Sequence, residues 1–175
     1  PHDVSILLYL LGETPEEVSA RGFACLQRGV EDVVFMTLAF PSGIGANVHL
    51  SWLDPHRVRQ TTVVGSRKMA VYDDVSNDAK IVIYDRGVDR IPNSASPTEF
   101  SDFAQFQLLP RHGDVTIPAF DFPEPLRLVC SHFVDCIRNG ERPLTDGLHG
   151  LEVVKVLEAT QRSMSKGGVP SRVGD

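Results

Sequence analysis

The sequence lacks the features that mark membrane-spanning, disulfide-stabilised and nucleic-acid-binding proteins. Its longest apolar run, residues 6–11, is six residues long, whereas a membrane-spanning helix needs about 18. Its three cysteines are an odd number and widely separated, which argues against a disulfide framework and predicts a reduced, cytoplasmic compartment. The formal net charge of −6 disfavours sequence-independent binding to nucleic acid, because that binding depends on neutralising phosphates. We therefore expect neither a membrane nor nucleic acid among its partners.

The sequence also lacks the short motifs that are typical of phosphate-binding, metal-binding and nucleophilic sites. It contains no G-x-G-x-x-G or G-x-x-x-x-G-K-[ST] phosphate-binding loop, no C-x-x-C or H-E-x-x-H metal motif, and no G-x-S-x-G nucleophile turn. Its six histidines are isolated from one another. We interpret His49, His132 and His149 as structural or surface residues, and we predict no metal site.

What the sequence does contain is an ordinary globular composition, with 42% apolar and 23% charged residues among 175. We expect residues 1–175 to form a single domain. An apolar block at residues 4–11, closed by Gly12 and Pro15, predicts a short buried helix. Six strands are predicted after it, at residues 17–27, 33–40, 47–53, 57–64, 69–72 and 81–84. Their connections are too short for parallel crossovers, so the strands should form an antiparallel meander.

The second half of the chain predicts an irregular segment followed by two helices. Residues 86–114 carry prolines, glycines and three phenylalanines, with possible strands at 103–109 and 115–117. Helical periodicity then runs from about residue 125 to Gly140. A last helix, capped by Thr145 or Asp146, should continue to about Lys166. Two apolar stripes mark the buried faces of these helices, namely Leu126, Val129, Cys130, Phe133, Val134 and Ile137 in the first, and Leu148, Leu151, Val154 and Leu157 in the second.

Strands grouped before helices predict an α+β fold, in which an open, mainly antiparallel sheet carries its helices on one face. The other sheet face is apolar as well. In the strand at residues 33–40, alternation places Met36 and Leu38 on one face and Val33 and Phe35 on the other. Three helices cannot cover both faces. We therefore expect the second face to meet another copy of the chain, in a dimer or tetramer. If a sheet face is the interface, a charge at one of its apolar positions, such as Met36 or Leu38, should dissociate the oligomer.

Several segments share the order and spacing of one known domain. Residues 1–12 place His2 ahead of an apolar helix that ends in Gly12. Later segments follow the same pattern, namely residues 49–55, 57–59, 64–66, 71–74, 111–114, Pro118, 124–126, 132–133, 136–137, 143–147 and 154–159. Together they resemble the C-terminal domain of the Gfo/Idh/MocA oxidoreductases over essentially the whole chain, with the branch acting on sugars or sugar nucleotides most similar.

The resemblance implies a hydride transfer between a sugar carbon and a nicotinamide. It implies an N-terminal Rossmann domain that holds NAD or NADP, a lysine in a Glu-Lys-Pro motif, and an Asp four positions ahead of the catalytic histidine. His2 matches that histidine, whereas the Asp and the lysine would precede Pro1. We therefore expect this chain to be a C-terminal piece of a longer protein that is inactive by itself.

Two further residues are candidate substrate contacts. Ser5 stands where several members of the family carry an Asp near the substrate, which favours the sugar-nucleotide branch. Arg111 follows the irregular segment and can meet an anionic group. Two alternatives stay open: a non-catalytic sugar-binding and oligomerisation module, and an NAD-dependent glycosidase of the same family.

Overall fold

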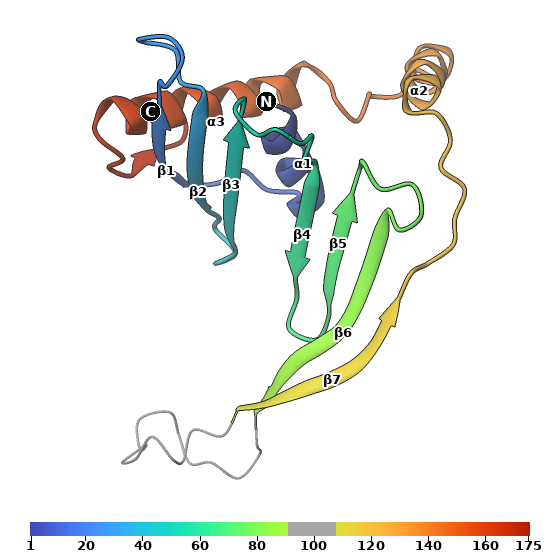
Figure 1. Ribbon diagram of the computed structural model, residues 1–175. Coiled ribbons are helices and arrows are strands. Elements are labelled where there is room, and N and C mark those ends of the chain that lie inside the picture. The colour runs from blue at the N-terminus through green and yellow to red at the C-terminus, as the bar shows by residue number, and fades with distance from the viewer. Residues whose placement is uncertain (91–107) are drawn as a thin grey trace. The chain divides into compact units, whose positions relative to one another are not determined.

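The structure, a computed structural model, describes residues 1–90 and 108–175, and the side chains of residues 1–87 and 113–175. It contains three helices and eight strands in these ranges (Figure 1). The α+β class predicted from the sequence is confirmed. The elements in chain order are α1 (His2–Leu11), β1 (Glu17–Phe23), β2 (Val33–Ala39), β3 (Gly45–Ser51), β4 (Gln60–Val64), β5 (Met69–Asp73), β6 (Ile81–Arg90), β7 (Leu108–Thr116), α2 (Pro125–Asn139), α3 (Gly147–Ser165) and β8 (Ser171–Arg172).

The described strands form two antiparallel sheets, whereas the sequence predicted one meander. The first has the order β3-β2-β1-β8 and the second has the order β4-β5-β6-β7. The chain accordingly divides into two compact units, one made of residues 1–54 and 123–175 and the other of residues 55–122. The break falls between β3 and β4, where Pro55 lacks the N–H that a continuous ladder would need.

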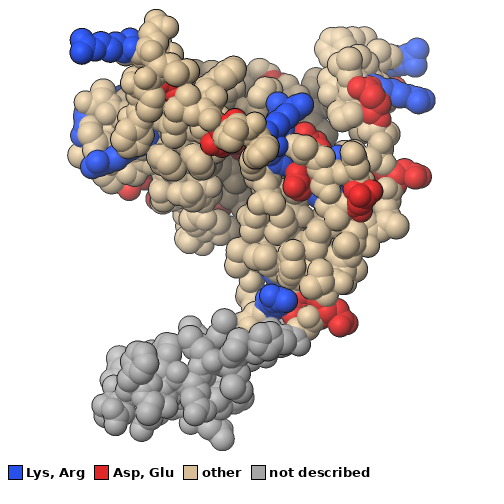
Figure 2. Space-filling model, viewed as in Figure 1, with Lys and Arg blue, Asp and Glu red and all other residues tan. Residues whose placement is uncertain are grey.

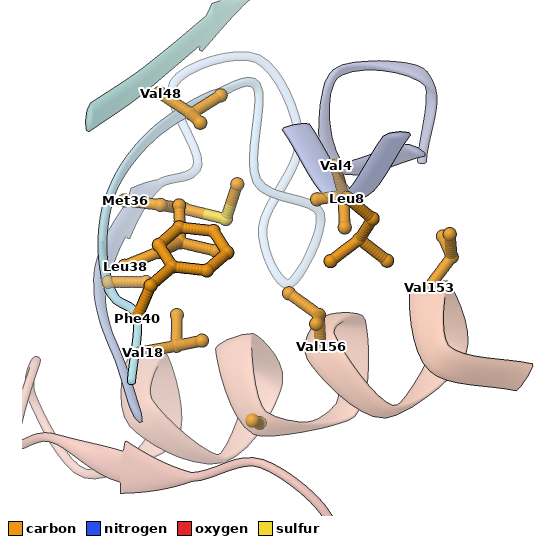
Figure 3. Close-up of a cluster of buried hydrophobic side chains, with 11 residues drawn as sticks. Val4, Leu8, Val18, Met36, Leu38, Phe40, Val48, Val153 and Val156 are labelled. Carbon is orange, nitrogen blue, oxygen red and sulfur yellow. The ribbon is translucent and has the colours of Figure 1, made fainter. Parts of the chain in front are cut away.

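In the first unit, α1 and α3 cover one face of the sheet and enclose the core (Figure 3). Val4 and Leu8 come from α1, and Val153 and Val156 come from α3. They pack against the inward side chains of the strands, of which Met36 and Leu38 are 2% and 1% exposed. Phe35, the residue before Met36 in β2, is 44% exposed on the opposite face. The alternation predicted for this strand is therefore confirmed.

A buried hydroxyl also joins α3 to β1. Ser163 is fully buried, and its Oγ accepts a hydrogen bond from the backbone N–H of Ala20 at 2.9 Å. The same hydroxyl donates to the backbone carbonyl of Val169 at 2.8 Å. The buried N–H of Ala20 would lose this partner without it, so the serine helps to fix the position of the helix over the strand.

The predicted helices are present, but their buried faces differ from the prediction. In α2, the side chain of Glu124 caps the first turn by accepting the backbone N–H groups of Leu126 and Arg127. Gly140 ends the helix in the left-handed conformation, with a φ of 67°. Its predicted apolar stripe is nevertheless largely exposed, and Cys136 is its buried residue. In α3 the buried side is formed by other residues than the predicted ones, namely Val153, Val156, Ala159, Thr160 and Ser163.

The prediction for α3 was wrong because this helix carries apolar residues on more than one side. Leu148, Leu151 and Val154 are 60%, 48% and 48% exposed, and Leu157 is partly buried. The sequence pattern alone contains two overlapping apolar stripes, and the sheet selects the one with the smaller side chains. Small residues such as Ala159 allow the helix to approach the strands closely.

The second unit is a four-stranded sheet of its own. Its ladders pair β4 with β5, β5 with β6, and β6 with β7, and the last pairing shifts register between Tyr84 and Arg86. β6 and β7 are longer than predicted. The possible strand at residues 103–109 falls mostly outside the described residues. On the face shown in Figure 2, basic and acidic side chains are interspersed rather than gathered by sign.

Candidate functional site

The first turns of α1 place two of the predicted site residues on one side of the helix. His2 begins α1 and Ser5 follows three residues later, a spacing that makes side chains neighbours on a helix surface. Val4 and Leu8 occupy the adjacent side and are buried in the core. Consequently His2 lies exposed to solvent and Ser5 is half-buried at the rim of the core. The backbone N–H of Ser5 donates to the carbonyl of Pro1 at 2.9 Å, which closes the first helical turn.

Ser5 is joined to a histidine from the other end of the chain. Its Oγ lies 2.9 Å from Nε2 of His149, in the first turn of α3. Both side chains are half-buried. The contact connects the two helices beside the core that Val4, Leu8, Val153 and Val156 form. Because this core fixes α1 against α3, the Ser5–His149 pair is held by packing around it.

The start of α3, which carries His149, is itself fixed by an acidic cap. Oδ1 of Asp146 accepts a hydrogen bond from the backbone N–H of His149 at 2.9 Å. Asp146 also forms an ion pair with Arg142. The hydrogen bond from Arg142, followed by that from the His149 backbone, lowers the pKa of Asp146 from 3.8 to about 2. Asp146 is therefore ionised at neutral pH and holds the first turn of α3 in place.

A second polar contact ties the same face of α3 to the segment after α1. Oγ1 of Thr14 donates to Oε2 of Glu152 at 3.2 Å. Glu152 lies three residues after His149, so these two contacts follow one side of the helix. Nζ of Lys155 lies 2.6 Å from Oε1 of Glu152. The hydrogen bond from Lys155 is the main cause that lowers the pKa of Glu152.

The third predicted site residue, Arg111, belongs to the second unit. It lies in β7, where its backbone pairs opposite Gly87 of β6. Its side chain lies outside the described side chains. The structure thus brings His2 and Ser5 together on α1, and it leaves the role of Arg111 as a prediction.

The described residues do not fit a nicotinamide dinucleotide. A dinucleotide's pyrophosphate is typically bound where a parallel strand leads through a glycine-rich turn into a helix. Within residues 1–90 and 108–175, every strand pairing is antiparallel. The same ranges hold no cluster of three or more His, Cys, Asp or Glu side chains suited to a metal ion. Nor do they hold a helix of the length and apolarity that crossing a membrane requires.

Sequence reasoning treated His149 as an ordinary structural or surface residue and missed its contact with Ser5. No local signal could have revealed this contact, because the two residues are 144 positions apart. The other singled-out histidines have local roles. His49 stacks on Phe35 with ring centroids 4.6 Å apart, and Nε2 of His132 accepts the backbone N–H of Leu144 at 3.1 Å.

Comparison with protein families gives one match. Residues 1–71 match the model of the GFO/IDH/MocA C-terminal domain. This segment contains α1 with His2 and Ser5, as well as β1 to β4 and the start of β5. The resemblance to Gfo/Idh/MocA oxidoreductases inferred from the sequence is thereby confirmed over residues 1–71. No curated protein matches the chain.

Solved structures share the fold of the chain. An aldose–aldose oxidoreductase from Caulobacter crescentus is 21% identical with a TM-score of 0.67, over 98% of this chain and 45% of its own. The UDP-N-acetylglucosamine 3-dehydrogenase of Acidithiobacillus ferrooxidans is 17% identical with a TM-score of 0.73, over 94% and 45%. The WlbA dehydrogenase of Bordetella pertussis, solved with NADH and UDP-GlcNAcA, is 20% identical with a TM-score of 0.62, over 99% and 43%. The chain thus spans about half the length of the proteins it resembles.

Proposed function

We propose that this chain is the substrate-binding and oligomerisation domain of an NAD(P)-dependent oxidoreductase acting on a sugar or a sugar nucleotide. The observation that carries the proposal is the placement of His2 beside Ser5 on α1, within the segment that matches the Gfo/Idh/MocA domain. We further propose that an N-terminal Rossmann domain of the full-length protein holds the cofactor, since the described residues do not fit one. The protein is proposed to work in the cytoplasm, and the chain alone to be inactive.

In this proposal the residues of α1 bind the substrate and accept the proton of the hydroxyl group that is oxidised. Oxidation of an alcohol carbon to a carbonyl removes a hydride from carbon and a proton from oxygen. A nicotinamide cofactor, when bound, would supply the hydride acceptor. His2 accepts the proton, which suits an imidazole because its ordinary pKa lies near neutrality. Ser5, on the same side of the helix, binds a substrate hydroxyl, and Arg111 contacts an anionic group such as a diphosphate.

The outer face of the first sheet is the proposed contact between copies of the chain. Phe35 is 44% exposed there, and it packs edge-on against Phe23 and stacks on His49. A shallow hollow on the same face is lined in part by Arg21, Phe23 and Phe35. An exposed aromatic cluster of this kind is typical of surfaces that another protein covers.

The test measures cofactor reduction by the full-length protein with a panel of sugars and sugar nucleotides. We expect net formation of NADH or NADPH with at least one of them. His2→Asn should lower kcat about 100- to 10,000-fold, the usual contribution of a general base. His56→Asn, an exposed histidine in the turn after Pro55, is the matched control and should leave kcat unchanged.

Two other results would contradict the proposal and identify the alternatives. Release of free sugar without net cofactor reduction would indicate a glycosidase. Sugar binding with neither cofactor binding nor turnover would indicate a non-catalytic module. Full activity of the His2→Asn variant would show that His2 is not the proton acceptor.

A further inference from the structure

The hydrogen bond between Ser5 and His149 has consequences for any ligand of Ser5. A serine hydroxyl rotates freely about its Cβ–Oγ bond and carries one donor and two acceptor sites. With His149 Nε2 at 2.9 Å, one of these sites is occupied and the rotation is restricted. The remaining sites keep a defined direction. Ser5 as a residue is half-buried, three positions after the exposed His2 on α1.

The protonation of Nε2 in His149 decides what Ser5 offers to a ligand. If Nε2 carries no proton, it accepts the serine hydroxyl proton, and Oγ is left to accept a hydrogen bond from a substrate hydroxyl. If Nε2 carries a proton, it donates to Oγ, and the serine proton is left to donate to a substrate oxygen. In both states the imidazole orders the hydroxyl before the substrate arrives. Such ordering reduces the entropy lost on binding.

The ring of His149 is well placed for this role because its own backbone is anchored. Asp146 accepts the backbone N–H of His149 at 2.9 Å and is paired with Arg142. On the opposite side of the contact, Val4 and Leu8 hold α1 in the core on either side of Ser5 in sequence. Both partners therefore sit on helices that packing and capping have fixed, which is what a precise site requires.

We propose that His149 is a positioning residue for substrate binding, which acts by orienting the hydroxyl of Ser5 on the side of α1 that carries His2. The proposal rests on the proposed function, because it takes Ser5 as a substrate contact. It assigns to the first turn of α3 a part in substrate recognition. The substrate group concerned is a sugar hydroxyl, which can both donate to and accept from an ordered serine.

The experiment uses the full-length protein and the best substrate found in the activity panel. His149→Leu removes the polar partner of Ser5 and should raise KM about fivefold to tenfold, the loss of one neutral hydrogen bond, while kcat changes less than twofold. Ser5→Ala should have the same effect. The double variant should raise KM no further than either single variant, because the two residues act as one unit.

A rescue variant and a matched control separate positioning from general stability. His149→Gln keeps an amide within reach of Ser5 and should restore KM to within about twofold of the unsubstituted protein. Thr14→Val breaks the neighbouring polar contact with Glu152 on the same side of α3. It should leave KM unchanged, even if it lowers the melting temperature as much as His149→Leu does.

The outcomes distinguish this proposal from the proposed function. Unchanged KM in both His149→Leu and Ser5→Ala, in an active enzyme, would overturn the positioning role and leave the oxidoreductase in place. Additive effects in the double variant would also overturn it, since independent residues add. A full-length protein that oxidises no sugar or sugar nucleotide would overturn the proposed function, and the positioning role with it.

Discussion

At the scale of single residues, charge and hydrogen bonding concentrate at the start of α3. Asp146 accepts the backbone N–H of His149 and pairs with Arg142, and these contacts lower its pKa to about 2. A carboxyl group whose pKa is lower in the folded state stabilises the fold at pH values above its unfolded pKa. That contribution is therefore present at neutral pH, and it is lost as the pH falls from about 4 towards about 2.

The first prediction concerns this titration. We expect Asp146 to titrate with a pKa of about 2 in the folded protein. Arg142→Ala should raise that pKa towards the ordinary value of 3.8, because it removes the main cause of the shift. The hydrogen bond from the His149 backbone N–H should still hold the pKa somewhat below 3.8. NMR of the side-chain carboxyl carbon during an acid titration measures both values. Arg138→Ala, which removes an arginine from the last turn of α2, is the control and should leave the pKa of Asp146 unchanged. An Asp146 pKa near 3.8 in the unsubstituted protein would contradict the prediction.

At the scale of elements, the joint between α3 and β1 depends on one buried hydroxyl. Ser163→Ala would leave the N–H of Ala20 and the carbonyl of Val169 without the partner they share. We expect the free energy of unfolding to fall by about 2 kcal/mol, the typical cost of buried polar groups left unpaired. Urea unfolding followed by circular dichroism measures this change.

A second serine in the same helix provides the control for this prediction. Ser165 is exposed, and its hydroxyl donates to the carbonyl of Arg162 at the end of α3. Ser165→Ala should change the free energy of unfolding by less than about 0.5 kcal/mol, as surface substitutions usually do. Equal effects of the two substitutions would show that burial of Ser163 is not what makes it important.

The elements that the sequence predicted well are those with a single clear period. The strand containing Met36 and Leu38 alternates strictly, and both residues are buried as alternation requires. β8 was not predicted, because two residues carry no period. The buried face of α3 was misjudged, because its sequence fits two apolar stripes and only contact with the sheet selects one. Sequence reasoning placed Ser5 on the first helix and His2 just ahead of it, whereas the structure begins that helix at His2. It could not bring His149 to them, since long-range contacts leave no local pattern.

At the scale of the whole molecule, the two faces of the first sheet serve different purposes. Met36 and Leu38 lie in the core under α3, so a charge at either residue tests folding and not assembly. Met36 and Leu38, which the sequence alone suggested for testing the interface, are therefore unsuitable, and Phe35 is the position to substitute instead. Phe35 is the neighbour of Met36 on the exposed face.

The third prediction follows from this distinction. If copies associate through the outer sheet face, Phe35→Asp should convert the oligomer to monomers, because a buried unpaired charge is costly at an interface. Met36→Asp should instead prevent folding. Sedimentation velocity of the full-length protein measures assembly, and thermal unfolding measures folding. Lys166→Asp, a charge change at the C-terminal cap of α3, is the control and should leave the sedimentation profile unchanged. An unchanged profile for Phe35→Asp would place the interface elsewhere.

The first unit is built from two stretches of chain separated by the second unit, and this order matters while the protein is being made. β1, β2 and β3 emerge from the ribosome well before α3, which begins only at Gly147, 96 residues after Ser51. At about 5–20 residues per second, that interval lasts roughly 5 to 20 s. During it, Met36, Leu38 and Phe40 have no α3 to pack against. The nascent chain therefore exposes an apolar sheet face until α3 is synthesised.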